Sequence, residues 1–345
     1  MSGVQVAIVG AGVIGRRHIK ALAEVERAQL AALADPSPGA RQLAAELGVP
    51  AYSDADEMLA EQAIDLAVIA TPTERHFADA EACLAGGANL LIEKPLAASM
   101  AEAEEIAGLA EAAGKKVLVG HQRRYYPCAR EARTLLQSGQ LGDLIAVTGQ
   151  WTARKDTPYF SAEWRRKRAA GPVLTNLIHE IDLLRFVCGE IVSVSADMTS
   201  HDQNFEKEDA VSISLRFANG AVGCFLLSDR TPTPWTWEQG LGESERFPKN
   251  GLNSWRIMGS AGALEFPNLQ LWAHPSPPGD WHFPISARPI DTDFIDAYVA
   301  QLEHGCDVIL NGAAPITDAR DAGRSLAAVL AVLEAAESGT RIRID

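Results

Sequence analysis

The stretch Val4-Gln5-Val6-Ala7-Ile8-Val9-Gly10-Ala11-Gly12-Val13-Ile14-Gly15 decides the fold of this chain. Its apolar run ends abruptly at Gly10, and a segment compatible with a helix starts just past Gly12. This order predicts a buried parallel strand, a tight turn and a helix N-terminus whose unpaired N–H groups face a pyrophosphate. The glycine pattern alone is a weak signal, because short glycine patterns also arise by chance.

Asp35 strengthens the prediction. It lies twenty positions after Gly15, at the end of a second apolar segment at 29–34. A carboxylate there accepts hydrogen bonds from an adenosine ribose diol and repels a 2′-phosphate. We therefore expect a dinucleotide site that prefers NAD, with NADP the weaker alternative. The competing interpretation is a glycine-rich turn in some other α/β domain.

Length and composition set the class of protein. The chain has 345 residues, 47% of them hydrophobic and 22% charged, which is enough for two globular domains. Its formal charge of −14 argues against nucleic acid or an anionic membrane as a partner. No apolar run is long enough to span a bilayer, and the first strand begins at Val4. We therefore expect no signal peptide and a cytoplasmic location.

The cysteines predict neither a disulfide framework nor a zinc site. They are five in number, scattered along the chain, and without C-x-x-C spacing. The chain also shows no cluster of His, Cys and carboxylate residues at the spacing of metal ligands. We expect reduced, mostly buried thiols and a site that needs no metal.

The first 120 residues alternate between strand-like and helical segments, which predicts βαβ units building a parallel sheet covered on both faces. The strand-like runs are 4–9, 29–34, 65–70, 88–92 and 116–119. The helical patterns are 14–25, 38–47, 54–60, 74–86 and 99–113. We assign residues 1–122 to an NAD(P)-binding Rossmann domain.

After Gly120 the pattern changes to period-two alternation, which predicts an open, mostly antiparallel sheet with helices. The alternating runs are 144–153, 191–199, 209–217, 220–228, 254–259, 262–266 and 268–273, with a short strand-like tail at 341–344. Helices are expected at 127–138, 171–188 and 315–337, and a long irregular loop at 229–253. Asn219-Gly220 predicts a hairpin. We assign residues 123–345 to an α+β domain for substrate binding and oligomerisation.

The stretch Ala70-Thr71-Pro72-Thr73-Glu74-Arg75-His76 follows the third strand of the first sheet. It falls at the edge where open parallel sheets bind ligands, so Thr71 and Pro72 would face the cofactor. A plain strand exit with Thr73 as N-cap is an alternative compatible with that role. His76 falls in the first turn of the next helix, where we favour a structural role over a catalytic one.

The stretch Leu91-Ile92-Glu93-Lys94-Pro95 brings two charged residues to the same edge. The ammonium of Lys94 could hydrogen-bond a developing alkoxide, or donate a proton in the reverse direction. The alternative is a surface lysine at the end of a strand, which is the commoner fate of this residue type.

The segment 171–182 predicts a helix that carries polar residues on one face. Thr175 and His179 are four residues apart, and His179 and Asp182 are three apart, so all three would share that face. Histidine titrates near neutral pH and can take a proton from a hydroxyl. A helical histidine taken alone is more often a packed or surface residue.

At these residues the chain resembles the Gfo/Idh/MocA family (glucose–fructose oxidoreductase, inositol 2-dehydrogenase, rhizopine catabolism). The matching pieces, in family order over about residues 4–190, are Gly10-Ala-Gly-Val-Ile-Gly15, Ala70-Thr-Pro…His76, Glu93-Lys94-Pro95, Gly120-His-Gln-Arg-Arg-Tyr125, Trp164-Arg165 and the helix carrying His179 and Asp182. The resemblance implies hydride transfer between NAD(P) and a sugar, sugar acid or cyclitol hydroxyl. It implies Lys94 and His179 as catalytic residues, and a cis bond before Pro95.

The residue patterns and the resemblance together lead us to expect two sets of contacts. The expected cofactor contacts are Gly10, Gly12, Val13, Ile14, Gly15, Asp35, Thr71, Pro72, His76, Glu93, Lys94, Gln122, Trp164 and Arg165. The expected substrate contacts are Lys94, Arg123, Tyr125, Thr175, Asn176 and His179, with Arg124 in the same segment.

The sequence departs from the family pattern in front of the histidine. Many members carry Asp four residues before it, whereas this chain has Thr175 there, followed by Asn176. A carboxylate that could anchor a substrate hydroxyl is therefore missing, which weakens transfer of any particular substrate. Thr175 could instead hydrogen-bond its own helix.

Two other functions remain open at this point. One is an NAD-using lyase or glycosidase that oxidises its substrate transiently. The other is a non-enzymatic regulator that senses a dinucleotide or a sugar, against which the presence of both Lys94 and His179 argues. Because an open sheet needs one face covered, we expect a homodimer or homotetramer formed through the second sheet.

Overall fold

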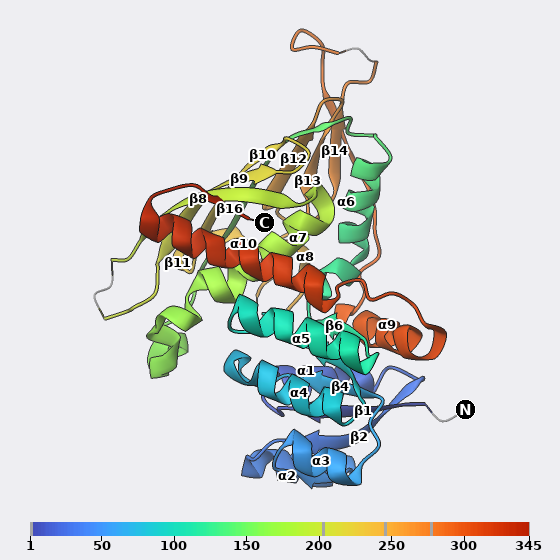
Figure 1. Cartoon of the computed structure of the whole chain (residues 1–345). Helices are drawn as coiled ribbons and strands as arrows, with labels where there is room; N and C mark the ends of the chain where they lie inside the picture. Colours follow the sequence, from blue (N-terminus) through green and yellow to red (C-terminus); the bar gives the residue numbers. More distant parts are fainter. Residues whose placement is uncertain (1–2, 202–203, 245–246, 277–278, 345) are drawn as a thin grey trace. The chain divides into compact units, whose positions relative to one another are not determined.

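The computed structural model of the chain describes residues 3–201, 204–244, 247–276 and 279–344. The chain divides into two compact units, shown in Figure 1 in colours that follow the sequence. Unit 1 comprises the residues up to Tyr125 together with Ile295–Leu326, and unit 2 comprises Tyr126–Phe294 together with the residues from Ala327 onward. Residues 295–326, which the sequence analysis assigns to the second domain, thus pack with the first unit.

Unit 1 is built on a six-stranded parallel sheet in the order β3-β2-β1-β4-β5-β6. The strands are β1 (Val4–Val9), β2 (Ala28–Ala34), β3 (Ala51–Tyr52), β4 (Leu66–Ile69), β5 (Asn89–Ile92) and β6 (Val117–Val119). The strand order reverses at β1, which lies between β2 and β4. This doubly wound order confirms the expected Rossmann fold and places its ligand-binding crevice beyond the end of β1.

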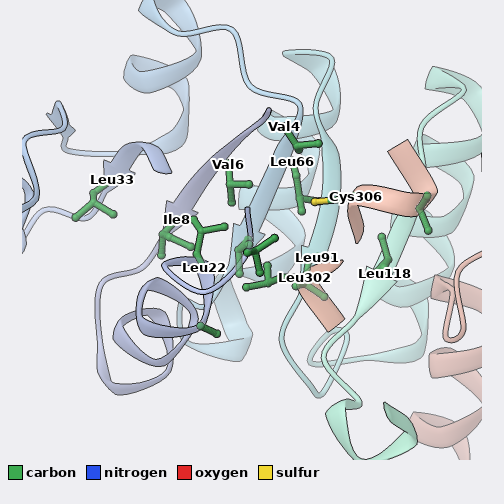
Figure 2. Close-up of a cluster of buried hydrophobic side chains, with 14 of the residues drawn as sticks. Val4, Val6, Ile8, Leu22, Leu33, Leu66, Leu91, Leu118, Leu302 and Cys306 are labelled. Carbon is green, nitrogen blue, oxygen red and sulfur yellow. The ribbon is translucent and has the colours of Figure 1, made fainter. Parts of the chain in front are cut away.

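Helices cover both faces of this sheet. They are α1 (Val13–Leu22), α2 (Pro38–Leu47), α3 (Ala55–Glu61), α4 (His76–Ala85), α5 (Met100–Ala113) and α9 (Ala297–Asn311). Val4, Val6 and Ile8 project from β1 into one core with Leu22 of α1 and Leu302 of α9 (Figure 2). Helix α4 packs against both α3 and α5.

No helix or strand is predicted from the sequence at residues 297–311. They form α9, and the side chain of its N-cap residue, Asp296, accepts hydrogen bonds from the N–H groups of Tyr298 and Val299. Cys306 and Val308 are buried in the same core as Val4, Val6 and Ile8. Figure 2 shows Cys306 beside Leu66 of β4. The distance along the chain between α9 and its packing partners explains why local pattern alone did not assign it to the first unit.

Unit 2 is built on a ten-stranded sheet in the order β15-β14-β13-β12-β7-β10-β9-β8-β16, with β11 paired to β7. The strands are β7 (Leu144–Arg154), β8 (Ile191–Thr199), β9 (Ala210–Phe217), β10 (Val222–Ser228), β11 (Arg230–Trp235), β12 (Trp255–Gly259), β13 (Ala263–Phe266), β14 (Gln270–Ala273), β15 (Ser286–Pro289) and β16 (Ile342–Arg343). Only the β7–β10 pair among them is parallel, so the expected mostly antiparallel sheet is confirmed. The hairpin predicted at Asn219-Gly220 joins β9 to β10, with φ of +90° at Gly220.

One face of this sheet is solvent-exposed. Along β9 and β10 buried residues alternate with exposed ones, and the exposed set on β10 is Val222, Cys224 and Leu226. On the buried face, the indole N–H of Trp255 donates to the Glu180 carboxylate at 2.9 Å. The alternation therefore produces the open sheet that the sequence predicts.

The helices of unit 2 are α6 (Pro127–Gln137), α7 (Ile178–Cys188) and α8 (Trp237–Leu241), while α10 (Ala319–Ser338) contributes residues to both units. The expectation of an irregular loop at 229–253 is wrong in part, because β11 and α8 lie within it. The Thr236 hydroxyl caps α8 by accepting from the Gln239 N–H, and Trp237 packs against Tyr126 and Phe266. These ring contacts come from distant parts of the chain and leave no local periodicity.

Candidate functional site: a dinucleotide cradle and a polar helix turn

The turn after β1 has room only for glycine at two positions. Gly10 has φ of +93°, and a Cβ built on it would lie 2.7 Å from the backbone of Ala70 at the end of β4. A Cβ on Gly15 would collide with the carbonyl oxygen of Gly10. The glycines therefore let the start of α1 approach the carboxyl ends of two neighbouring strands.

The N-terminus of α1 presents unpaired N–H groups beside this turn. Gly12 is its N-cap, and among the described residues no side chain caps it and no acidic residue occupies its first turn. The next two side chains, Val13 and Ile14, are 63% and 39% exposed. A helix dipole facing outward with exposed apolar side chains next to it suits a ligand that carries both phosphates and an apolar ring.

Asp35 lies against the same turn. Its two carboxylate oxygens accept hydrogen bonds from the N–H groups of Ala11 and Ser37, each at 2.8 Å. Burial acts to raise the pKa of this carboxyl, but the Ser37 and Ala11 hydrogen bonds and the Arg16 charge outweigh it and hold the pKa below its usual range. The group is therefore ionised at neutral pH, as an acceptor for ribose hydroxyls must be.

His76 connects the segment that follows β4 to the turn at Lys94–Pro95. Its Nε2 lies 3.0 Å from the carbonyl oxygen of Thr71, and its Nδ1 lies 3.0 Å from that of Pro95. The residue is only 1% exposed. These contacts give His76 the structural role favoured from its position, while the Thr71 hydroxyl donates to Asp79 at 2.7 Å.

Glu93 is buried beneath Lys94. One carboxylate oxygen lies 2.8 Å from Nε2 of His18 in α1, and the other accepts from the Lys94 N–H at 3.2 Å. Burial acts to raise the pKa of Glu93, but the hydrogen bond and charge of His18 outweigh it and lower the pKa. The stabilisation by this pair is present above the carboxyl's unfolded pKa and is lost as the pH falls through the lowered folded value. The Lys94–Pro95 bond is cis, as expected.

The helix expected at 171–188 begins with a different geometry. Val173–Leu177 form a π-helical turn, and the α-helix α7 starts only at Ile178. The shared face expected for Thr175 and His179 assumes α-helical spacing, which does not apply across a π turn with its i→i+5 bonds. The assumption holds only for His179 and Asp182, which both lie in α7. Single π turns occur frequently at functional sites.

Polar contacts surround this turn. The Thr175 hydroxyl lies 3.0 Å from the carbonyl oxygen of Gly171, which is the bond to its own helix considered above. Asn176 accepts at Oδ1 from the Lys155 ammonium at 3.0 Å. The Glu208 carboxylate accepts from the Val173 N–H at 2.7 Å, and it fills the space that a Cβ on Gly171 would need.

Two lysines and one aspartate lie behind Asn176. The Asp229 carboxylate is fully buried, 2.8 Å from the ammonium of Lys207 and 3.4 Å from that of Lys155. Burial lowers the pKa of Lys155, and the Asp229 charge opposes that effect. None of these three residues was predicted from the sequence, where the one available signal is that Lys155 directly follows a long alternating strand.

Two family models match the chain. The description "Oxidoreductase family, NAD-binding Rossmann fold" matches residues 4–121, and "GFO/IDH/MocA C-terminal domain" matches residues 129–265. The rhizopine catabolism protein MocA of Rhizobium meliloti is 29% identical over 250 residues, which cover 71% of this chain and 77% of the relative. The scyllo-inositol 2-dehydrogenase (NAD(+)) of Bacillus subtilis is 27% identical over 350 residues, covering 99% of this chain and 96% of the relative.

Solved structures share the fold over nearly the whole chain. The WlbA dehydrogenase from Bordetella pertussis, solved with NADH and UDP-GlcNAcA, gives a TM-score of 0.82 at 24% identity and covers 99% of both chains. The chain belongs to the Gfo/Idh/MocA family. It is an NAD-binding oxidoreductase of a family that includes sugar and cyclitol dehydrogenases.

The remaining residues that match Gfo/Idh/MocA motifs are placed as follows. Gln122, Arg123 and Tyr125 are buried in a short 3-10 turn of unit 1. In unit 2, Trp164 is 60% exposed and the guanidinium of Arg165 stacks 4.2 Å from the Tyr159 ring centroid. The expected contacts of these five residues with cofactor or substrate stay predictions.

Among the described residues, no group of three or more His, Cys, Asp or Glu residues could hold a metal ion. None of the helices in the described part of the chain is long and apolar enough to cross a membrane. All five cysteines are free thiols, and Cys224 is the exposed one.

The contacts of Asp35 give a prediction about cofactor choice. Asp35→Asn places an amide NH₂ where one carboxylate oxygen now accepts an N–H, and it removes the charge that repels a 2′-phosphate. A hydrogen bond to a charged group contributes about 1.5–3 kcal/mol, so we expect affinity for NAD to fall roughly 10- to 100-fold and the preference over NADP to shrink. Calorimetric titration with both dinucleotides measures this, with Asp56→Asn on the exposed first turn of α3 as control. An unchanged NAD/NADP ratio would remove Asp35 from ribose recognition.

Proposed function

We propose that this protein is an NAD-dependent dehydrogenase that oxidises a hydroxyl group of a sugar, sugar acid or cyclitol. The observation that carries the proposal is the cradle in unit 1, where Asp35 is hydrogen-bonded to the Ala11 N–H inside the glycine turn. The name of the Bacillus subtilis relative, a scyllo-inositol 2-dehydrogenase (NAD(+)), supports the substrate class.

The residues that fit the cofactor are Gly10, Gly12, Val13, Ile14 and Gly15 of the turn, with Asp35 as the ribose acceptor. NAD supplies the acceptor for the hydride that leaves the carbinol carbon. The His179 imidazole accepts the proton of the same hydroxyl, so that the carbinol loses one hydride and one proton and becomes a carbonyl. The Lys94 ammonium stabilises the negative charge that develops on the oxygen.

The proposal includes further contacts. Thr71, Pro72, Gln122, Trp164 and Arg165 contact the cofactor, and Arg123, Tyr125, Thr175 and Asn176 contact the substrate. Gln122, Arg123 and Tyr125 are buried, which supports fixed positions for these side chains. Hydrogen bonds do the same for Thr71, Thr175 and Asn176. The Glu93 carboxylate accepts a hydrogen bond from the backbone N–H of Lys94. The expected contacts of Glu93 and His76 with NAD stay predictions.

A panel of neutral sugars, sugar acids and inositols, each with NAD or NADP, tests the proposed function. We expect NADH to accumulate, measured by its absorbance, with at least one class. Binding of NAD without NADH from any class would favour a sensing role. Cleavage of a glycosidic bond without accumulation of NADH would favour transient oxidation.

The exposed face of the ten-stranded sheet in unit 2 supports the proposal that copies of the protein form an oligomer. We expect a homodimer or homotetramer that covers Val222, Cys224 and Leu226 of β10. Light scattering at micromolar concentration measures the mass, and a monomeric mass would contradict this expectation.

A further inference from the structure

A cavity of about 790 Å³ lies in unit 2, between the segment that follows β7 and the start of β11. Its lining is strongly basic, and among its described lining residues none is acidic. The lining residues that bear on ligand binding are Arg154, Lys155, Arg166, Arg230, Phe160 and Phe205. Four positive groups therefore share one cavity in a chain whose formal charge is −14.

Two of these cations oppose each other directly. Arg154 at the end of β7 is the cross-strand partner of Arg230 at the start of β11. Like charges directly opposite on neighbouring strands destabilise a sheet. An anion bound in the cavity would offset this repulsion.

Backbone carbonyl groups hold the third arginine, Arg166, in place. The Arg166 guanidinium donates to the carbonyl oxygens of Phe160 at 2.8 Å and Ser161 at 3.3 Å. On the opposite side, Arg230 stacks 5.2 Å from the Phe205 ring centroid, with its Nε 3.4 Å from an Asp209 oxygen. Oriented guanidinium groups suit the paired oxygens of a carboxylate or phosphate.

The layer around the cavity carries both signs of charge. The buried Asp229 carboxylate lies 3.4 Å from the Lys155 ammonium and 2.8 Å from that of Lys207, and an Asp209 oxygen lies 3.4 Å from Arg230. Among the described residues, no carboxylate forms an ion pair with Arg154 or Arg166, so these two arginines keep the lining positive. Lys155 also connects the cavity to the polar helix turn, because its ammonium donates to Asn176, three residues before His179.

We propose that this cavity binds the anionic group, a carboxylate or a phosphate, of a carbohydrate. The rings of Phe160 and Phe205, 5.0 Å apart, provide an apolar wall for the C–H face of the sugar. The volume lies within the range of small-molecule sites and exceeds what a bare inorganic ion needs. The inference rests on the proposed function and narrows its substrate to a sugar acid or sugar phosphate.

Calorimetry on the full-length protein without cofactor tests the binding. The ligands are D-gluconate, D-glucose 6-phosphate, D-glucose, myo-inositol and sulfate. We expect one of the two anionic sugars to bind at least about tenfold more tightly than the neutral ones, and more weakly as salt is raised. If D-gluconate and D-glucose 6-phosphate both bind no more tightly than D-glucose, the inference is overturned. Sulfate binding as tightly as the anionic sugars would leave only a plain anion site and would also overturn it.

Two variants separate a binding role from a structural one. Arg154→Ala and Arg166→Ala should each lower affinity for the anionic sugar by about tenfold. Arg216→Ala, on the exposed face of β9, should leave that affinity unchanged. Because Arg154→Ala removes a like-charge pair, its Tm without ligand should not fall. A lowered Tm with unchanged affinity would assign Arg154 a structural role and contradict the inference.

The NADH assay distinguishes failure of this inference from failure of the proposed function. NADH formed equally from neutral and anionic sugars, without calorimetric preference, would refute the cavity's role and keep the dehydrogenase. Arginine-dependent binding of an anionic sugar without NADH from any substrate would keep the cavity's role and refute the dehydrogenase.

Discussion

His179→Ala will lower kcat by about 10²- to 10⁴-fold, the usual contribution of a positioned general base. His179 is half-buried in the first turn of α7, directly after the π turn that carries Thr175 and Asn176. The variant removes the group proposed to accept the substrate proton. NAD affinity should hardly change, because the cradle that fits NAD belongs to unit 1.

Steady-state kinetics with the best substrate from the sugar panel measures this effect. His282→Ala is the matched control, because that histidine lies on an exposed segment before β15. A Tm close to that of the unaltered protein shows that α7 is intact. Turnover within a factor of about two of the unaltered enzyme would exclude His179 as the base.

Lys94→Ala will lower kcat/KM by about 10²- to 10³-fold, the loss typical of removing one group that stabilises a developing oxyanion. The backbone of Lys94 is fixed on one side by the Glu93 carboxylate and on the other by the His76 contact to Pro95. The truncation leaves both contacts in place, so the loss should come from the missing ammonium rather than from a rearranged turn.

Lys94→Arg tests the same point by restoring the charge. Because a guanidinium stays protonated, it can stabilise an oxyanion but cannot donate a proton at neutral pH, so we expect partial recovery in oxidation. Lys116→Ala is the control, because Lys116 is an exposed lysine beside Asn89 at the amino edge of the same sheet. Full activity of Lys94→Ala would contradict the proposed role.

The first unit was largely predictable from sequence because its signals are local. The run from Val4 to Val9, the glycines after it and Asp35 lie within one βαβ unit, where turn geometry and hydrophobic pattern agree. The second sheet was predictable for a similar reason, since period-two alternation marks each strand separately.

The elements that were missed depend on distant contacts. Helix α9 shares a hydrophobic core with β1, which lies nearly three hundred residues earlier in the chain. In α8, Trp237 packs against the rings of Tyr126, just before α6, and Phe266 of β13. The basic cavity combines residues from four separate segments, none of which carries a motif. The π turn has the same apolar composition as an α-helical turn, so no local signal distinguished it.

The π turn also allows two properties of the site to change independently. One is the identity of the side chains in front of His179, and the other is the position of His179 itself. A π turn contains one residue more than an α turn, so residues can be inserted or deleted there without disturbing the buried residues Ile181 and Leu184 that anchor α7. The side chains in front of His179 can therefore change in identity and direction while His179 keeps its position. Changes in the π turn can therefore alter the side chains in front of His179 without moving the residue that we propose as the base.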